Sequence, residues 1–301
     1  MKEYVVGIDV GGTNIRVGLM NSKLEILKKE TALTKQFETA KDFIKHIKAM
    51  IDKVNVDKKA DTVGIVLPVP WMEGNEKITD ATTVPFLENV KYEDIKKELL
   101  GYDVHFENDV NVIAFLEANV GGAVGYENSI YITVSTGIGS GVIIGNQIYH
   151  GANGYAGEIG RIPLYHSKKG RQVFEDLCSG TALLEESNRL YGKDANKSKK
   201  LFDKYQVGDA KAVQVIEEWK EMFSDGLAAT LQMLDPGVVV LGGPVIINHA
   251  WIVEELIEST SRKLLDCLVE KMKIVTSQFG IDAGLLGAGY YALECQKRSK
   301  K

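Results

Sequence analysis

Residues 9–16, Asp-Val-Gly-Gly-Thr-Asn-Ile-Arg, constrain the fold of this chain more than any other stretch. The β-forming residues 4–8 precede the two glycines, and a second run of alternating apolar residues follows them. This pattern predicts a strand, a tight turn and a second strand. Glycines at successive turn positions permit positive φ and let backbone N–H groups approach an anion, while Thr13 and Asn14 add side-chain donors. The turn is a candidate phosphate hairpin faced by Asp9, and an ordinary Gly-Gly hairpin is the alternative.

Composition limits the partners and the compartment of the chain. Its 301 residues, 45% hydrophobic and 26% charged, are enough for two packed domains. The net charge of −5 gives no basic field, so we expect no nucleic acid and no membrane partner. The 3 cysteines lie far apart, which argues against a disulfide framework and favours a cytoplasmic protein. No apolar run approaches a membrane span, and we expect neither a signal peptide nor a helix-turn-helix module before the first strand.

A second glycine-rich turn repeats the chemistry of the first. Residues 135–141, Ser-Thr-Gly-Ile-Gly-Ser-Gly, lie between a predicted strand and the apolar residues 142–144. Because a helix and a buried strand also follow the first hairpin in a β-α-β order, the fold class is α/β. We expect two related domains that face a central cleft. The N-terminal domain spans residues 1–115 with a closing helix at about 285–298, and the larger C-terminal domain spans residues 116–284.

Asp109 stands between a predicted strand, residues 103–107, and a predicted helix, residues 110–120. The carboxyl end of a strand followed by a helix N-terminus is where open α/β sheets place ligand-binding groups. An N-cap without further function is the alternative for this aspartate. Later in the chain, a glycine-rich segment surrounds Glu158, and Gly242-Gly243 follow a fully apolar strand.

In this order the features match the plan of actin-like ATPases, which have two ribonuclease H-like domains. Within that superfamily the chain resembles the ROK family (repressors, open reading frames and kinases) of sugar kinases over essentially its whole length. Six blocks carry the resemblance: Asp9 to Arg16, Glu107 to Asn111, Thr136 to Gly141, Gly157 to Gly160, Glu175 through Ser179-Gly180, and Asp235 to Gly243.

The resemblance implies a role for each of these positions. Asp109 is implied to be the general base toward a sugar hydroxyl, with Asn108 holding the sugar. Asp9 is implied to orient Mg²⁺ or its waters. The positions implied to bind the nucleotide are Asp9, Gly11, Gly12, Thr13, Asn14, Arg16, Thr136, Gly137, Gly139, Gly242 and Gly243. The positions implied to bind the sugar are Asn108, Asp109, Glu158, Arg161 and Glu175.

The sequence departs from the family pattern at its zinc motif. Relatives have Glu-x-Gly-His followed by a cysteine cluster, whereas here Arg161 replaces the histidine and residues 162–174 contain no cysteine. We therefore expect no zinc. Arg161 could instead donate to the sugar or pair with Glu158 or Glu175.

These features together predict an ATP- and Mg²⁺-dependent enzyme that phosphorylates the 6-hydroxyl of a hexose. Asp-Val-Asn at 109–111 and Val-Pro-Phe at 84–86 resemble allose kinases of the family, and glucose is the other candidate substrate. Relatives commonly dimerise, so the resemblance implies a homodimer. Two alternatives stay open: a non-catalytic sugar-binding regulator that kept the fold, and an actin-like ATPase of another type.

Overall fold

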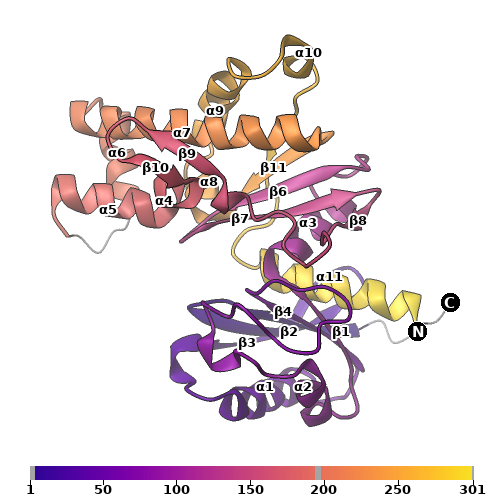
Figure 1. Cartoon of the computed structure of the whole chain (residues 1–301). Coiled ribbons are helices and arrows are strands. Elements are labelled where there is room, and N and C mark those ends of the chain that lie inside the picture. Colours follow the sequence, from indigo (N-terminus) through magenta and orange to yellow (C-terminus); the bar gives the residue numbers. More distant parts are fainter. Residues whose placement is uncertain (1–3, 194–197, 300–301) are drawn as a thin grey trace. The chain divides into compact units, whose positions relative to one another are not determined.

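The computed structural model describes residues 4–193 and 198–299. The chain forms two compact units, each built around a five-stranded sheet (Figure 1). Unit 1 consists of residues 1–116, 148–156 and 281–301, and unit 2 consists of residues 117–147 and 157–280. The domain boundaries that we expect from the sequence, at residues 115 and 284, remain a prediction.

Unit 1 contains the first hairpin and the closing helix. The bounds of its elements are β1 (Tyr4–Val10), β2 (Asn14–Asn21), β3 (Ile26–Leu33), α1 (Ala40–Val54), β4 (Thr62–Leu67), α2 (Tyr92–Glu98), β5 (Asp103–Asn108), the start of α3 (Asp109–Val120), and α11 (Ala283–Arg298), with 3₁₀ turns at Thr34–Gln36 and Pro85–Leu87. The strand order is β3-β2-β1-β4-β5. β1 and β2 form the predicted antiparallel hairpin, and β4 runs parallel to both β1 and β5.

Alternate residues of β1 face opposite sides of this sheet. Val6, Ile8 and Val10 are buried in the core cluster that includes the apolar stripe of α1. Val5 belongs to a separate buried cluster with residues of α11. Because side chains alternate along a strand, Asp9 lies on the α11 side. The carboxylate is therefore directed toward α11 rather than into the α1 core.

Thr39 starts α1 as the sequence predicts. Its side-chain oxygen accepts a hydrogen bond from the backbone N–H of Asp42, which satisfies one of the first free donors of the helix. The helix then buries one stripe of apolar residues and ends at Val54.

Unit 2 contains the second glycine-rich turn and most of the helices. The bounds of its elements are β6 (Ser129–Val134), β7 (Ile138–Ile144), β8 (Gln147–Ile148), a 3₁₀ turn (Ile159–Arg161), β9 (Pro163–His166), β10 (Gly170–Val173), α4 (Phe174–Cys178), α5 (Gly180–Tyr191), α6 (Lys199–Gln206), α7 (Ala210–Leu234), β11 (Val238–Gly242), α8 (Gly243–Asn248), α9 (Ile252–Ser261), α10 (Asp266–Val269) and β12 (Ile274–Thr276). The last residue of β8, Ile148, already belongs to unit 1.

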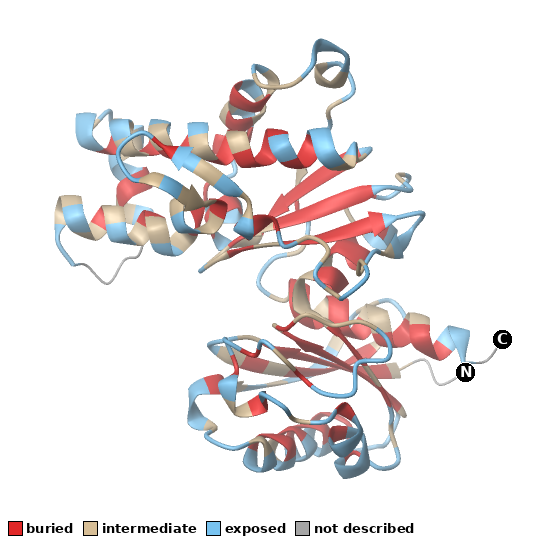
Figure 2. Ribbon diagram, in the orientation of Figure 1, coloured by how far each residue is buried: buried red, intermediate tan, exposed pale blue. Residues whose placement is uncertain are grey.

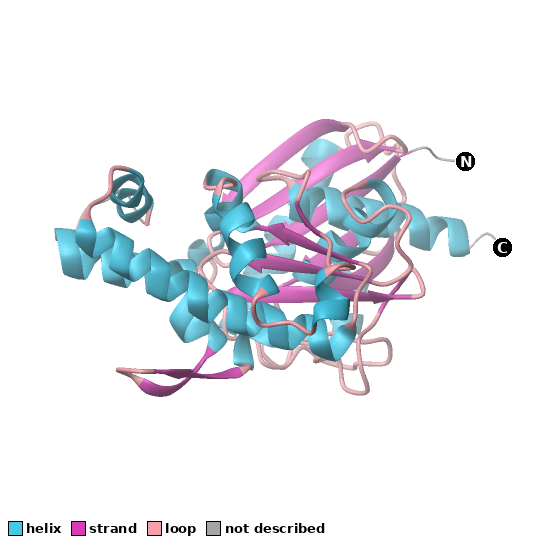
Figure 3. Ribbon diagram, turned by 90° about the horizontal axis from the view of Figure 1, so that it is seen from above, coloured by secondary structure: helices cyan, strands magenta, loops and turns pink. Residues whose placement is uncertain are grey.

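The sheet of unit 2 has the order β12-β11-β6-β7-β8. β6 and β7 form an antiparallel hairpin, and β11 runs parallel to β6. The central strands of both sheets are buried (Figure 2). The β9–β10 hairpin, which the sequence did not predict, is a separate two-stranded sheet (Figure 3).

The architecture confirms the predicted α/β class, with two sheets that carry helices. None of the helices in residues 4–193 and 198–299 has the length and apolar character needed to cross a membrane.

Candidate functional site

The first glycine turn joins β1 to β2 and leaves its tip exposed. The backbone N–H of Gly11 donates to the carbonyl of Asn14 at 2.9 Å, which closes the turn. Gly12 and Thr13 are exposed. Neither glycine adopts the positive φ that the sequence suggested. A Cβ on Gly12 would lie 2.6 Å from the methyl group of Thr83, so a larger residue there would have to displace that side chain.

Asp9 is buried beside this turn, at 7% exposure. Its register partner across the hairpin is Arg16, whose Nη1 donates to Asp9 Oδ2 at 3.0 Å. A Cβ on Gly284 of α11 would lie 2.9 Å from the carboxyl group, so glycine there leaves it room. Burial raises the pKa of Asp9, Arg16 lowers it, and the charge of Asp282 raises it.

Asp109 is the first residue of α3, directly after β5. Its Oδ1 accepts from the backbone N–H of Val110 at 3.0 Å. The side chain of Asn108 makes the capping contacts, since its Oδ1 accepts from Val110 N at 2.9 Å and from Asn111 N at 3.0 Å. Asn108 thus fills the N-cap position that was the alternative role for Asp109.

The position of Asn108 is fixed by a further contact. Its Nδ2 donates to the carbonyl of Val69, in the loop after β4, at 3.0 Å. The Nδ2 atom of Asn108 carries two hydrogens, so its second N–H can donate to another acceptor. Since β1, β4 and β5 are parallel neighbours, Asp9 and Asp109 lie at the same carboxyl edge of the sheet.

The second glycine turn in unit 2 is held by α4 and α5. Oε2 of Glu175, on α4, accepts from the backbone N–H of Ile138 at 2.8 Å. A Cβ on Gly137 would collide with the same carboxylate oxygen, so glycine is required there. On α5, Thr181 Oγ1 donates to the carbonyl of Thr136 at 2.7 Å. The Glu175 carboxylate therefore stabilises the second glycine turn, and the sequence did not predict this contact.

Gly242 and Gly243 lie beside this turn. β11 is the parallel neighbour of β6, and Gly242 is the register partner of Thr133 near the end of β6. Gly243 has φ +84°, and a Cβ there would lie 2.5 Å from the Thr133 hydroxyl oxygen. The two predicted nucleotide segments of this unit therefore meet at the carboxyl ends of adjacent strands.

Glu158 and Arg161 flank the short 3₁₀ turn after the glycine-rich segment. The backbone N–H of Arg161 donates to the carbonyl of Glu158 at 3.1 Å, and both residues are exposed. Partial desolvation of the carboxyl group and repulsion from Glu175 raise the pKa of Glu158, and Arg161 lowers it. A Cβ on Gly160 would lie 2.6 Å from the carbonyl of Ile138, so this turn packs against β7.

The structure thus brings the predicted residues together as two sets, one in each unit. The set in unit 1 is Asp9, Gly11, Gly12, Thr13, Asn14, Arg16, Asn108 and Asp109. The set in unit 2 is Thr136, Gly137, Gly139, Glu158, Arg161, Glu175, Gly242 and Gly243.

A family model for the ROK family matches residues 5–294 of the chain. The chain belongs to the ROK family. This confirms the resemblance seen in the sequence motifs.

The ROK chain is similar to characterised relatives over nearly its full length. It is 29% identical to an N-acetyl-D-glucosamine kinase of Photobacterium profundum, covering 94% of this chain and 97% of the relative. A ROK hexokinase structure from Thermus thermophilus matches with a TM-score of 0.83 and 30% identity, covering 98% and 99% of the two chains. A ROK family glucokinase from Streptomyces griseus, solved with glucose and AMPPNP, matches with a TM-score of 0.80 and 26% identity, covering 97% and 99%. These likenesses confirm the two-domain actin-like fold.

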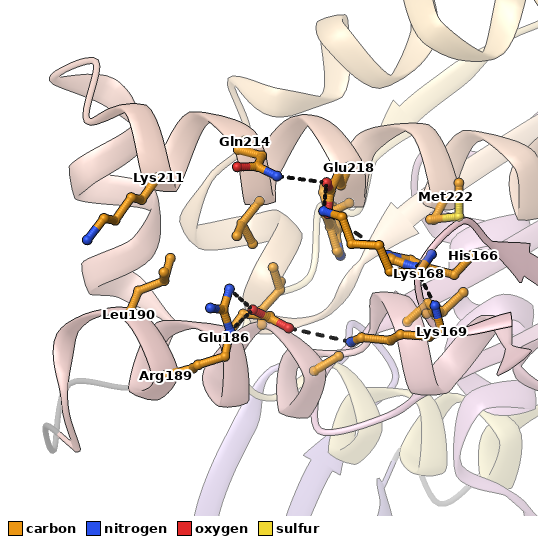
Figure 4. A pocket seen from close by; sticks show the side chains of 15 residues that line it. His166, Lys168, Lys169, Glu186, Arg189, Leu190, Lys211, Gln214, Glu218 and Met222 are labelled. Carbon is orange, nitrogen blue, oxygen red and sulfur yellow. Dashed lines mark hydrogen bonds and ion pairs between the residues drawn. The ribbon is translucent and has the colours of Figure 1, made fainter.

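One cavity of this ROK chain is lined by none of the predicted site residues. This cavity of about 700 Å³ lies in unit 2 between α5, α7 and the β9–β10 hairpin (Figure 4). Three of its cationic side chains form ion pairs with carboxylates that also line the cavity: Lys168 with Glu218, and Lys169 and Arg189 with Glu186. We do not assign this cavity to the candidate site.

No group of three or more His, Cys, Asp or Glu residues suited to a metal ion occurs within 4–193 and 198–299. His166 Nδ1 accepts from the backbone N–H groups of Lys168 and Lys169, which stabilises the turn of the β9–β10 hairpin.

Proposed function

We propose that the chain is an ATP-dependent kinase that transfers the γ-phosphate to the 6-hydroxyl of a hexose such as glucose or allose. One observation carries the proposal: Asp9 and Asp109 lie at the same carboxyl edge of the unit 1 sheet, beside an exposed glycine turn. The names of the relatives, hexokinase, glucokinase and N-acetylglucosamine kinase, support the reaction class.

Asp109 acts as the general base in this proposal. Its carboxylate takes the proton of the sugar 6-hydroxyl as the hydroxyl oxygen attacks the γ-phosphorus. The new bond joins phosphorus to the sugar oxygen, the bond between the γ-phosphorus and the bridging oxygen breaks, and ADP leaves. Asn108 holds the sugar through the second N–H of its Nδ2, because the first donates to the carbonyl of Val69. Glu158, Arg161 and Glu175 are proposed to accept from or donate to the other sugar hydroxyls.

The glycine turns are proposed to bind the nucleotide. Backbone N–H groups of Gly12, Thr13, Gly137 and Gly139 would donate to phosphate oxygens, with Gly11, Asn14, Arg16 and Thr136 beside them. Fixed backbone dipoles stabilise the charge that spreads over the γ-phosphate without having to reorganise. Gly242 and Gly243 would line the adenosine.

Mg²⁺ fits the residues around Asp9. A buried carboxylate offers the oxygen ligands that Mg²⁺ prefers. Burial raises the pKa of Asp9, and a nearby divalent cation favours its ionised form. Asp9 would hold the ion directly or through water, and the ion would neutralise negative charge on the phosphates.

A hexose panel tests the proposed function. We expect ADP release that depends on the sugar when the protein is incubated with ATP, Mg²⁺ and one of glucose, allose, mannose, fructose, N-acetylmannosamine or N-acetylglucosamine. Sugar binding without turnover in every case would point instead to a regulator that kept the fold.

Three further properties belong to the proposal: a cytoplasmic location, a homodimer and the absence of structural zinc. The zinc claim rests on Arg161 and on the cysteine-free residues 162–174. Metal analysis that finds one zinc per chain would overturn it, and the mass in solution tests the dimer.

A further inference from the structure

Glu107 is a fully buried carboxylate next to the proposed catalytic residues. Its side chain has 0% exposure, and both of its oxygens accept hydrogen bonds. Oε1 accepts from the backbone N–H of Asn108 at 2.9 Å and from Asn111 Nδ2 at 3.1 Å. These two bonds fix the corner between β5 and α3 (the β5–α3 corner, residues 107–111).

His150 supplies the partner of the other oxygen. Its Nε2 lies 2.8 Å from Glu107 Oε2, from a position 43 residues further along the chain. Among the described residues this is the one ion pair that Glu107 makes. After burial, the charge of Glu107 is one cause of the raised pKa of Tyr92, Tyr291 and Cys295. His150 supplies the hydrogen-bond partner of Oε2 in this buried carboxylate.

The segment around His150 (the strap, residues 148–156) belongs to unit 1, although the residues before and after it belong to unit 2. The His150 ring packs edge-on against Trp71 at 5.5 Å between centroids. Gly154, with φ +82°, approaches the Trp71 backbone so closely that a Cβ would lie 3.1 Å from it. The hydroxyl of Tyr155 donates to Asp80. The contact with Trp71 holds the imidazole in place for Glu107, whereas the Tyr155 contact lies elsewhere on the strap.

We propose that His150 is a positioning residue for the phosphoryl transfer, acting through Glu107 on the β5–α3 corner from which Asn108 and Asp109 project. The inference rests on the proposed function. Without a donor on Oε2, a carboxylate with no access to water has to find another partner, and the donors that it already contacts through Oε1 belong to the corner itself. Rotation of Glu107 would then loosen Asn108 and shift Asp109 relative to the sugar hydroxyl.

Two substitutions separate the hydrogen bond from the ring. His150→Phe keeps a ring against Trp71 and removes the donor, whereas His150→Gln removes the ring and keeps an N–H donor. We expect the Phe variant to lose about tenfold to a hundredfold in kcat at an unchanged KM for ATP, because small misplacements of catalytic groups have effects of this size. The Gln variant is expected to stay within about threefold of wild type. Tyr155→Phe, which weakens the strap elsewhere, serves as the matched control and keeps its kcat.

Hydrogen exchange gives a readout that does not depend on activity. In His150→Phe, the amide of Asn108 should exchange at least about tenfold faster, with peptides of the unit 2 sheet unchanged. If the wild type shows no sugar-dependent turnover but this exchange difference is found, the proposed function fails while the link from His150 to the corner stands. Equal kcat in the Phe and Gln variants, or unchanged exchange at Asn108, would overturn the inference. Should the Phe variant not fold, the Gln variant decides alone, since loss of its activity or of Asn108 protection contradicts the proposal.

Discussion

The buried carboxyl group of Asp9 lowers the stability of the protein and is also proposed to hold Mg²⁺. Its carboxyl group is buried, and burial raises its pKa above the usual value of 3.8 more than Arg16 lowers it. A carboxyl group with a raised folded-state pKa favours folding below its unfolded pKa and loses that contribution as the pH rises through the folded pKa. At neutral pH the burial of this carboxyl group therefore destabilises the protein in the absence of Mg²⁺.

Asp9→Asn should consequently stabilise the protein at neutral pH. The amide oxygen still accepts from Arg16 but carries no charge. We expect a Tm higher by on the order of a few degrees at pH 7, measured in EDTA without nucleotide, and a difference that narrows as the pH falls toward 4. A variant that is less stable than wild type at pH 7, or a difference independent of pH, would contradict this account of Asp9.

Sequence motifs located the proposed catalytic aspartates but not the contacts that hold them. Asp9 and Asp109 follow buried strands, and that local pattern is readable from the sequence. The pairing of Glu107 with His150 joins positions 43 residues apart and has no local signal. The same holds for Glu175, whose contact with Ile138 depends on where α4 begins. The functional roles that the motifs assign to these residues are therefore predictions, and activity measurements test them.

At the scale of elements, small residues allow α11 to approach the unit 1 sheet closely. A Cβ on Gly7 of β1 would lie 2.9 Å from the backbone nitrogen of Gly289, and one on Gly64 of β4 would collide with the carbonyl oxygen of Ala288. On the same helix Gly284 leaves room for the Asp9 carboxyl group. The close approach of α11 to the unit 1 sheet therefore determines both how the helix packs and how much room the Asp9 carboxyl group has.

Gly64→Ala tests this packing. The added methyl group has to push α11 away, so we expect a loss of about 1–3 kcal/mol in the free energy of unfolding, as is typical of overpacking. Gly280→Ala is the matched control, because an added Cβ there meets no atom within 4 Å. Denaturant unfolding of both variants measures the effect, and equal stabilities would mean that α11 is not held as closely as described.

The element-level prediction failed where the local pattern was weak. The β9–β10 hairpin lies in a segment that is polar and has no clear alternation, Tyr165 to Arg171. The Nδ1 atom of His166 accepts hydrogen bonds from two backbone N–H groups and so stabilises the turn of this hairpin. A buried imidazole acceptor is a tertiary feature, so sequence periodicity does not reveal it.

For the whole molecule, the two glycine-rich turns predicted two α/β units, and each turn does join two antiparallel strands of its own sheet. This much followed from the sequence because both turns lie between strongly apolar strands. The choice of hexose did not, since Glu158 and Arg161 are exposed and Glu175 is engaged with the second turn. The nucleotide assignments rest on backbone geometry, whereas the sugar assignments rest on side chains, one of which, Arg161, departs from the family pattern.

Phosphorus NMR of the reaction with ATP, Mg²⁺ and the best sugar of the panel tests the proposed transfer to the 6-hydroxyl. We expect the γ-phosphate signal to move to a phosphate monoester split by two protons, as a 6-phosphate requires. We also expect Asp109→Asn to lower the rate by about a hundredfold to ten-thousandfold while ATP affinity is kept. Release of the γ-phosphate as inorganic phosphate, or an Asp109→Asn variant as fast as wild type, would contradict it.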